Sequence, residues 1–176
     1  MRLALAFALI CAAVAALPAP AAADTVVRSD ERIGSFRVKT DGTLGGARNA
    51  FGVPSRSVRT SDATCSVTWA RLGLRIGFYN LGGLPPCGRA TGHFSNAAIK
   101  GAQWRTGNGL AIGDRVSRLR TLYPGARYGA DGFGGEGWWL VTRRNATGPG
   151  TYPGLLARTR AGHVTALVVR YAAGGD

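Results

Sequence analysis

The side chains that could perform acid–base or nucleophilic chemistry are few in this sequence and far apart. The chain holds nine carboxylates, two histidines (His93 and His163) and three cysteines. Catalysis requires a nucleophile, a base and a group that orients the base. No HExxH zinc motif, GxSxG nucleophile elbow or SxxK pair is present. The sequence therefore predicts a protein that is not an enzyme and binds neither a metal ion nor a cofactor.

Both histidines stand next to glycine, in Thr91-Gly92-His93 and in Gly162-His163. Glycine beside a polar residue is typical of a turn. We therefore expect exposed histidines at turns rather than general bases. The alternative, an exported hydrolase of unfamiliar type, would require a cleft that joins one histidine to a carboxylate.

Cys65 and Cys87 are the two cysteines that follow the N-terminal leader. An even number of cysteines in an exported chain favours a disulfide. Such a bridge closes a loop of about 20 residues and contributes roughly 3 kcal/mol in the chain-entropy model. A reactive thiol or half of a metal site is the alternative, but neither CxxC nor CxH spacing is present.

Residues 1–23 have the three parts of a secretory signal peptide. Arg2 supplies the positive start, Leu3–Leu17 is an unbroken apolar run, and Ala21–Ala23 supplies the small residues at which cleavage is expected. A retained membrane anchor is the alternative, since a spanning helix needs about 20 apolar residues. With cleavage after Ala23, residues 24–176 form one exported domain without a stable transmembrane segment, in the cell envelope or outside the cell.

The formal net charge is +13, and every cationic residue except Lys39 and Lys100 is arginine. The arginines are scattered, with Arg143-Arg144 the longest run. Nucleic-acid binders concentrate basic residues on one face, so the chain is not expected to bind nucleic acid. One interpretation is that a GC-rich genome places arginine wherever a solvated cation is tolerated. The other is attraction to anionic envelope polymers or acidic protein surfaces.

Two helices are predicted from apolar periodicity. Thr43 is a candidate N-cap for a helix over Leu44–Phe51, which Gly52 and Pro54 end. A second apolar stripe runs from Ile112 to Tyr123, with Asp114 in its first turn and Pro124 after it.

Strands are predicted after each helix from period-two alternation. Leu72–Tyr79 alternates most clearly, and a tight link at Ala70-Arg71 joins it to Thr64–Trp69. A turn at Ala161-Gly162 separates the last two strands. The further strand segments are Gly88–Ile99, Trp138–Arg143, Leu155–Thr159 and His163–Tyr171. The chain therefore reads as an α+β domain with a mostly antiparallel sheet, two short helices on one face, and two helix–strand units in tandem at about 34–100 and 101–173.

The two helix openings carry a resemblance. Gly109–Asp114 with the following Tyr123-Pro124, and Thr43-Leu44 through Phe51–Ser55, resemble helix openings of secreted proteins from high-GC Gram-positive bacteria. A helix followed by a β-meander, given twice, is similar to the β-lactamase-inhibitor-protein fold and to small outer-membrane-assembly lipoproteins. That resemblance implies a non-catalytic domain that binds other proteins. The chain departs from the inhibitors in having one cysteine pair after the leader, and the resemblance carries over no binding residue.

Alternation also predicts an aromatic and arginine-rich sheet face. If Leu74 and Ile76 point inward, Arg75 and Tyr79 point outward, and Trp139 and Arg143 follow when Trp138 and Leu140 point inward. Trp, Tyr and Arg are the residues enriched at binding hot spots. The alternative is an ordinary solvated face. The candidate contact residues are Arg75, Tyr79, Trp139, Arg143 and Arg170.

We therefore expect a secreted or cell-envelope protein that recognises a protein or an envelope component through this face. The alternative function is a cationic structural or stress-related envelope protein that adheres to anionic wall polymers. Salt separates them, because adhesion through scattered charge weakens steeply with ionic strength.

Overall fold

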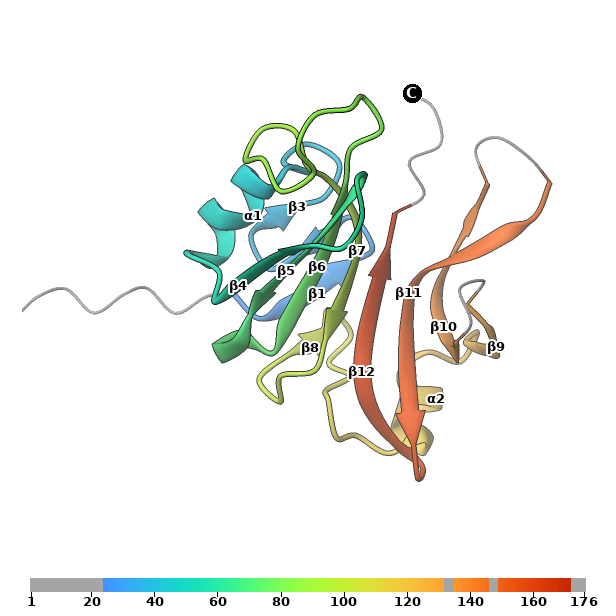
Figure 1. The fold of residues 1–176 in the computed structure, drawn as a ribbon. Helices are drawn as coiled ribbons and strands as arrows, with labels where there is room; N and C mark the ends of the chain where they lie inside the picture. The colour runs from blue at the N-terminus through green and yellow to red at the C-terminus, as the bar shows by residue number, and fades with distance from the viewer. Residues whose placement is uncertain (1–23, 132–134, 146–148, 172–176) are drawn as a thin grey trace, which may run out of the picture.

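The computed structural model describes residues 24–131, 135–145 and 149–171, shown as a ribbon in Figure 1. The predicted signal peptide, residues 1–23, lies outside this part of the chain. The helical elements of the described residues are α1 (Leu44–Phe51), α2 (Val116–Leu122) and the 3-10 turn η1 (Ala70–Leu72). The strands are β1 (Val26–Ser29), β2 (Arg32–Ile33), β3 (Phe36–Arg37), β4 (Arg56–Arg59), β5 (Thr64–Trp69), β6 (Leu74–Tyr79), β7 (His93–Ile99), β8 (Arg105–Thr106), β9 (Arg127–Ala130), β10 (Glu136–Arg144), β11 (Thr151–Arg160) and β12 (His163–Arg170).

Eight strands form one large antiparallel sheet in the order β4-β5-β6-β7-β12-β11-β10-β9. In the chain, α1 precedes β4–β7 and α2 precedes β9–β12. The two sets of four strands meet at the antiparallel pair β7 and β12, in the middle of the sheet. The described chain is thus α+β and mostly antiparallel sheet, as the sequence predicts.

A second, small sheet has the order β3-β2-β1-β8, and its β1 and β8 pair in parallel. The residue pattern does not predict it. Three of its four strands have only two residues each, namely β2, β3 and β8. Such short strands are below the length at which period-two alternation can be recognised.

The first helix forms as its end signals predict. The Thr43 hydroxyl accepts a hydrogen bond from the Gly46 backbone N–H at 3.1 Å, which satisfies one of the free donors of the first turn. Gly52 ends the helix with a φ of 78°, a conformation that glycine adopts without the strain of a side chain.

The second helix is shorter than predicted. It begins at Val116, so the prediction that Ile112 belongs to the helix and Asp114 to its first turn is wrong. The Asp114 carboxylate accepts hydrogen bonds from the Ala111 backbone N–H at 2.8 Å and from Arg118 at 3.1 Å. Asp114 therefore holds the residues before the helix in a turn. The predicted apolar stripe, which begins at Ile112, starts about one helical turn before the helix itself.

The predicted strand pair at β5 and β6 is present, with Leu72 placed in the connecting turn η1 instead of the strand. The last two strands are joined by Ala161 and Gly162, both with positive φ values of 51° and 77°. A two-residue connection with two positive φ values is the favoured hairpin turn for twisted strands, so this turn is confirmed.

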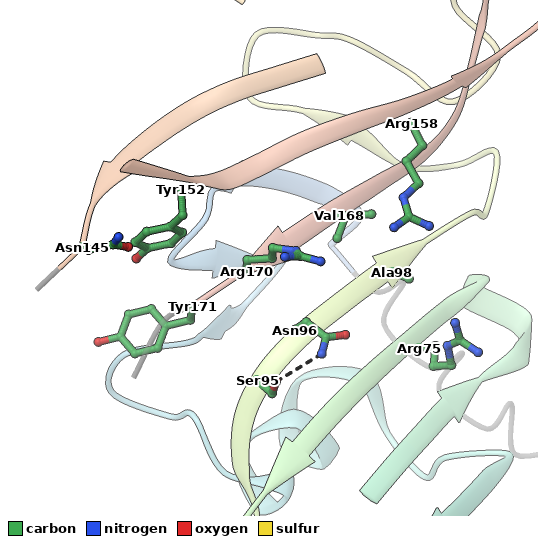
Figure 2. Close-up of a pocket in the computed structure, with 10 residues that line it drawn as sticks. All are labelled: Arg75, Ser95, Asn96, Ala98, Asn145, Tyr152, Arg158, Val168, Arg170 and Tyr171. Atoms are coloured by element: carbon green, nitrogen blue, oxygen red, sulfur yellow. Dashed lines mark hydrogen bonds between the residues drawn. The ribbon is translucent and has the colours of Figure 1, made fainter. Parts of the chain in front are cut away.

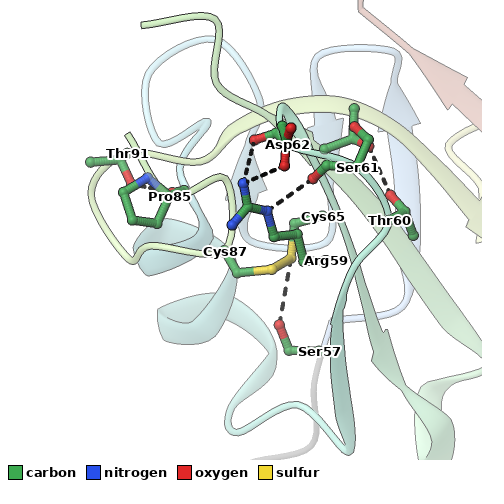
Figure 3. The surroundings of a disulfide bond; sticks show 10 residues. Ser57, Arg59, Thr60, Ser61, Asp62, Cys65, Pro85, Cys87 and Thr91 are labelled. Carbon is green, nitrogen blue, oxygen red and sulfur yellow. Dashed lines mark hydrogen bonds and ion pairs between the residues drawn. A yellow bond between two sulfur atoms is a disulfide. The ribbon is translucent and has the colours of Figure 1, made fainter. Parts of the chain in front are cut away.

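A disulfide joins Cys65 on β5 to Cys87 in the loop before β7, with Cα atoms 5.3 Å apart, and confirms the predicted pairing (Figure 3). Cys65 is buried, and its sulfur lies 3.5 Å from the Ser57 hydroxyl on the neighbouring strand β4. The bridge therefore fixes the long β6–β7 connection to the body of the large sheet.

The core lies between the large sheet and the elements that cover one of its faces, namely the small sheet and both helices (Figure 1). Its centre is aromatic: the Phe51 ring lies 5.9 Å from Phe36, 5.6 Å from Trp69 and 6.2 Å from Trp104. These rings come from α1, β3, β5 and the segment before β8. Buried Leu119 brings α2 into the same core.

Within the described ranges, no helix has the length and apolar character needed to cross a membrane.

Candidate functional site

One row of side chains crosses the large sheet on the face opposite the core, which we call the outer face. The register pairs Arg75 with Ala98, Ala98 with Val168, and Val168 with Leu156. The row continues to Trp139, which pairs with Leu156. Directly paired side chains lie on the same face. Arg75 and Trp139 therefore share the outer face, but with three strands between them they are roughly 19 Å apart.

The outer face is partly covered. Leu156 is fully buried there, and Ala166 and Val168 are nearly so. A side chain that points away from the core can be buried only by a second layer. That cover includes Asp131, which directly follows β9.

Asp131 is fully buried and contacts two strands that are not adjacent to β9. Its carboxylate accepts a hydrogen bond from Arg158 on β11 at 2.8 Å and lies 3.3 Å from Arg170 on β12. Its backbone carbonyl accepts a second bond from Arg170 at 2.6 Å. A flat sheet would place β9 about 14 Å from β12, so the sheet must curl to bring them together.

Two glycines permit this curl. A Cβ atom on Gly135 would lie 2.6 Å from the Arg158 guanidinium and 2.8 Å from the Asp131 carboxylate. A Cβ atom on Gly137 would lie 2.8 Å from Leu156 and 2.9 Å from the Ala157 carbonyl. Since real Cβ contacts essentially never fall below 3.0 Å, a side chain at Gly137 would displace the adjacent strand β11, and one at Gly135 would displace the Arg158 and Asp131 side chains.

An open pocket of about 370 Å³ lies on the outer face (Figure 2). Ala98 and Val168 form its apolar floor, and Arg75, Arg158 and Arg170 lie around them. This volume falls in the range of small-ligand sites, which combine an apolar surface with a few convergent polar groups. The other lining side chains are polar or aromatic: Ser95, Asn96, Asn145, Tyr152 and Tyr171.

The pocket is electropositive. Three arginines line it, and the carboxylate of Asp131, bound to two of them, offsets one of the three charges. Burial of the Arg170 side chain, which is 12% exposed, lowers the pKa of its guanidinium, and the Asp131 charge opposes that effect. Arginine stays protonated at neutral pH in any case. The arrangement can therefore bind an anion that also covers a small apolar surface.

The structure brings two of the five predicted contact residues together, since Arg75 and Arg170 both line the pocket. Tyr79 lies at the end of β6, where its ring is 6.2 Å from that of His93, outside the pocket.

Trp139 lies in a separate shallow hollow with Tyr128 and Thr151. The Arg127 guanidinium lies 5.3 Å from the centre of its ring system, within the range of a cation–π contact. The indole Nε1 is buried and has no hydrogen-bond partner among the described residues. Trp139 is therefore a half-buried residue of β10, next to the edge strand β9, and does not belong to the arginine pocket.

Arg143 is held by an ion pair and does not line the pocket. Its guanidinium donates two hydrogen bonds to the Asp30 carboxylate, at 2.6 and 2.7 Å. Strand β10 is irregular at Val141, but Arg143 pairs with Tyr152 in the same register that pairs Trp139 with Leu156, so the phase of alternation is the same at both residues. The hydrogen bonds to Asp30 raise the pKa of Arg143 further above neutral pH.

Sequence reasoning missed Arg158, Asp131 and the two pocket tyrosines. Alternation along β11 places Arg158 on the same face as Leu156, so the residue pattern could have predicted Arg158 on the outer face. Asp131 gives no such signal, because its partners are 27 and 39 residues away in the chain.

Neither histidine of the described chain lies in a catalytic arrangement. His163 Nδ1 is 2.9 Å from the Gly113 backbone carbonyl, and His93 has the Tyr79 ring as its neighbour. No hydrogen bond joins either histidine to a carboxylate in residues 24–131, 135–145 and 149–171. The same ranges contain no cluster of three or more His, Cys, Asp or Glu side chains that could hold a metal ion.

No protein-family model matches this chain, and neither a curated protein nor a solved structure is significantly similar to it.

Proposed function

We propose that this chain is an exported, non-catalytic binding protein that recognises a protein or another component of the cell envelope through its outer face. The observation that supports this most directly is the pocket of three arginines and two tyrosines around an apolar floor. Arginine and tyrosine are enriched at the centres of protein interfaces, where they combine apolar contact with directed hydrogen bonds.

Export is supported by the Cys65–Cys87 disulfide, because such bridges persist in oxidising compartments. The signal-peptide pattern over residues 1–23 also supports export, through the secretory pathway. We place the protein outside the cytoplasm on these two grounds.

We also propose that the fold is a tandem of two helix–strand units, as in the β-lactamase-inhibitor-protein fold. The element order supports it: each helix is followed by four strands, and the two sets join at β7 and β12. In such an arrangement, one face of the sheet packs on the helices and the other is available to a partner.

The test is capture of a partner from cell-envelope extract with immobilised protein, its Arg75→Glu variant and a matched Arg56→Glu variant. Arg56 is exposed at the edge strand β4 and does not line the pocket. We expect one discrete partner to be retained by the parent protein and by Arg56→Glu but lost by Arg75→Glu. Equal retention by all three proteins would contradict recognition through the pocket.

The second candidate function is adhesion to anionic wall polymers, favoured by the net charge of +13. In that case Arg56→Glu and Arg75→Glu weaken binding equally, and binding falls steeply as salt rises from 0.05 to about 0.5 M, where screening shortens to a few ångströms. An interface centred on the pocket retains most of its affinity over the same range.

A further inference from the structure

We propose that the arginine pocket binds a carboxylate attached to an apolar body, as a glutamate or aspartate beside an apolar residue in a partner protein supplies. This inference rests on the proposed binding function and specifies the chemistry of the group that enters the pocket.

The strand register explains why the three arginines converge. Arg75 pairs directly with Ala98 on β7, at one side of the floor. On β12, Arg170 is two residues beyond Val168, and Arg158 on β11 pairs two residues before it, with Ala166. Guanidinium groups therefore border the Ala98–Val168 floor from three strands.

Asp131 shows in the protein itself how a carboxylate is accommodated here. The Asp131 carboxylate lies 2.8 Å from the Arg158 guanidinium and 3.3 Å from the Arg170 guanidinium. These ion pairs fix both guanidinium groups before any ligand binds. Groups that are fixed in advance lose less conformational entropy on binding.

Arg75 is the arginine that remains available. Its side chain is exposed and makes no hydrogen bond or ion pair with another residue of the described chain. Arg158 is 46% exposed, and its contact with Asp131 involves Nη2, one part of a fork with five N–H donors. A ligand carboxylate between Arg75 and Arg158 would receive charge-assisted hydrogen bonds from both sides.

The floor and the tyrosines favour a carboxylate on an apolar body over a free phosphate. Methylene groups next to the carboxylate would cover Ala98 and Val168, and Tyr152 or Tyr171 would contact a neighbouring apolar side chain. Inorganic phosphate has no apolar part, so it would leave the apolar floor in contact with water and gain nothing from covering it.

The experiment titrates three probes into the isotopically labelled protein and follows backbone amide signals by NMR. The probes are acetyl-Leu-Glu-Leu-amide, the matched acetyl-Leu-Gln-Leu-amide, and inorganic phosphate. Each is measured with the parent protein and with the Arg75→Gln and Arg56→Gln variants, which change the net charge equally. Arg56 lies in the same cross-strand row, paired through Thr68 to Arg75, but outside the pocket.

We expect saturable binding of the glutamate peptide, with shifts at Arg75, Ala98 and Val168. Arg75→Gln should weaken it at least about tenfold, and Arg56→Gln less than about twofold. The glutamine peptide should bind at least about tenfold more weakly than the glutamate peptide.

Three results would overturn the inference: no saturable binding of the glutamate peptide, equal affinity for its glutamine counterpart or for phosphate, or equal weakening by the two variants. The spectra of both variants without ligand show whether each remains folded. If the glutamate peptide fails while partner capture still depends on Arg75, the proposed function stands and only the carboxylate is wrong. If the peptide binds but no partner is captured, the proposed function fails alone.

Discussion

The ion pair between Asp30 and Arg143 predicts that its two partners are unequal in their effect on stability. Asp30 is 2% exposed, whereas Arg143 is 41% exposed. Asp30 is also tightly packed, since its carboxylate occupies the space that a Cβ atom on Gly154 would need. A lone carboxylate at this position would have little access to water.

Replacing Arg143 with leucine leaves the Asp30 charge buried without its two hydrogen bonds. Loss of one partner from a buried pair costs about 3–5 kcal/mol. Because Arg143 is partly exposed and water can enter where it lay, we expect the lower end of that range, about 3 kcal/mol. Replacing Asp30 with asparagine leaves Arg143 hydrated and near Glu31, at 3.5 Å. The cost should then be about 1–2 kcal/mol, the contribution of a charge-assisted hydrogen bond.

The measurement is urea unfolding at neutral pH, followed by tryptophan fluorescence and far-ultraviolet circular dichroism. The slope of free energy against urea should be unchanged, so that midpoints report stability. The double variant should be more stable than Arg143→Leu alone, because asparagine removes the stranded charge. Equal costs for the two single variants, or a cost below about 1 kcal/mol for Arg143→Leu, would refute the assignment of Asp30 as a buried charge that depends on Arg143.

Three further predictions test other parts of the structure. Replacing both Cys65 and Cys87 with serine should lower the free energy of unfolding by roughly 3 kcal/mol, and a reducing agent should do the same to the parent protein but leave the variant unchanged. The hydrogen bond that Tyr128 donates to Glu136 raises the pKa of Tyr128; its stabilising effect is present below the ordinary tyrosine pKa of about 10 and is lost as pH rises through the raised value. Ultraviolet titration should therefore show one tyrosine ionising earlier in Glu136→Gln than in the parent protein, and an unchanged curve would contradict the bond. Gly137→Ala should destabilise the fold by about 1–3 kcal/mol through its clash with Leu156 and the Ala157 carbonyl, whereas Gly125→Ala, at a position with open space, should change the urea midpoint little.

Local signals in the sequence predict the local structure well. The sequence predicts Thr43 as the N-cap of α1 and Gly52 as the residue that ends it, and both residues have these roles in the structure. Strands β5 and β6 and the Ala161-Gly162 turn follow from alternation and from turn chemistry. In each case the deciding interaction joins residues close together in the chain, which is what periodicity can detect.

The candidate site depends on contacts that no local pattern contains. Alternation correctly places Arg75 on the outer face, but it cannot show that the sheet curls and brings Asp131 to Arg158 and Arg170. It also cannot show that Asp30 binds Arg143, because the two residues lie 113 positions apart in the chain. The arrangement of the pocket arginines therefore depends on long-range packing.

The two outermost strands of the large sheet, β4 and β9, bear on how the protein behaves at high concentration. Each has only four residues, and their exposed arginines are Arg56, Arg59 and Arg127. An unpaired edge strand can form backbone hydrogen bonds with a strand of another chain. Short edge strands with charged side chains disfavour such pairing. Because like-charged borders repel when two molecules approach edge to edge, we expect these arginines to disfavour self-association through strand addition.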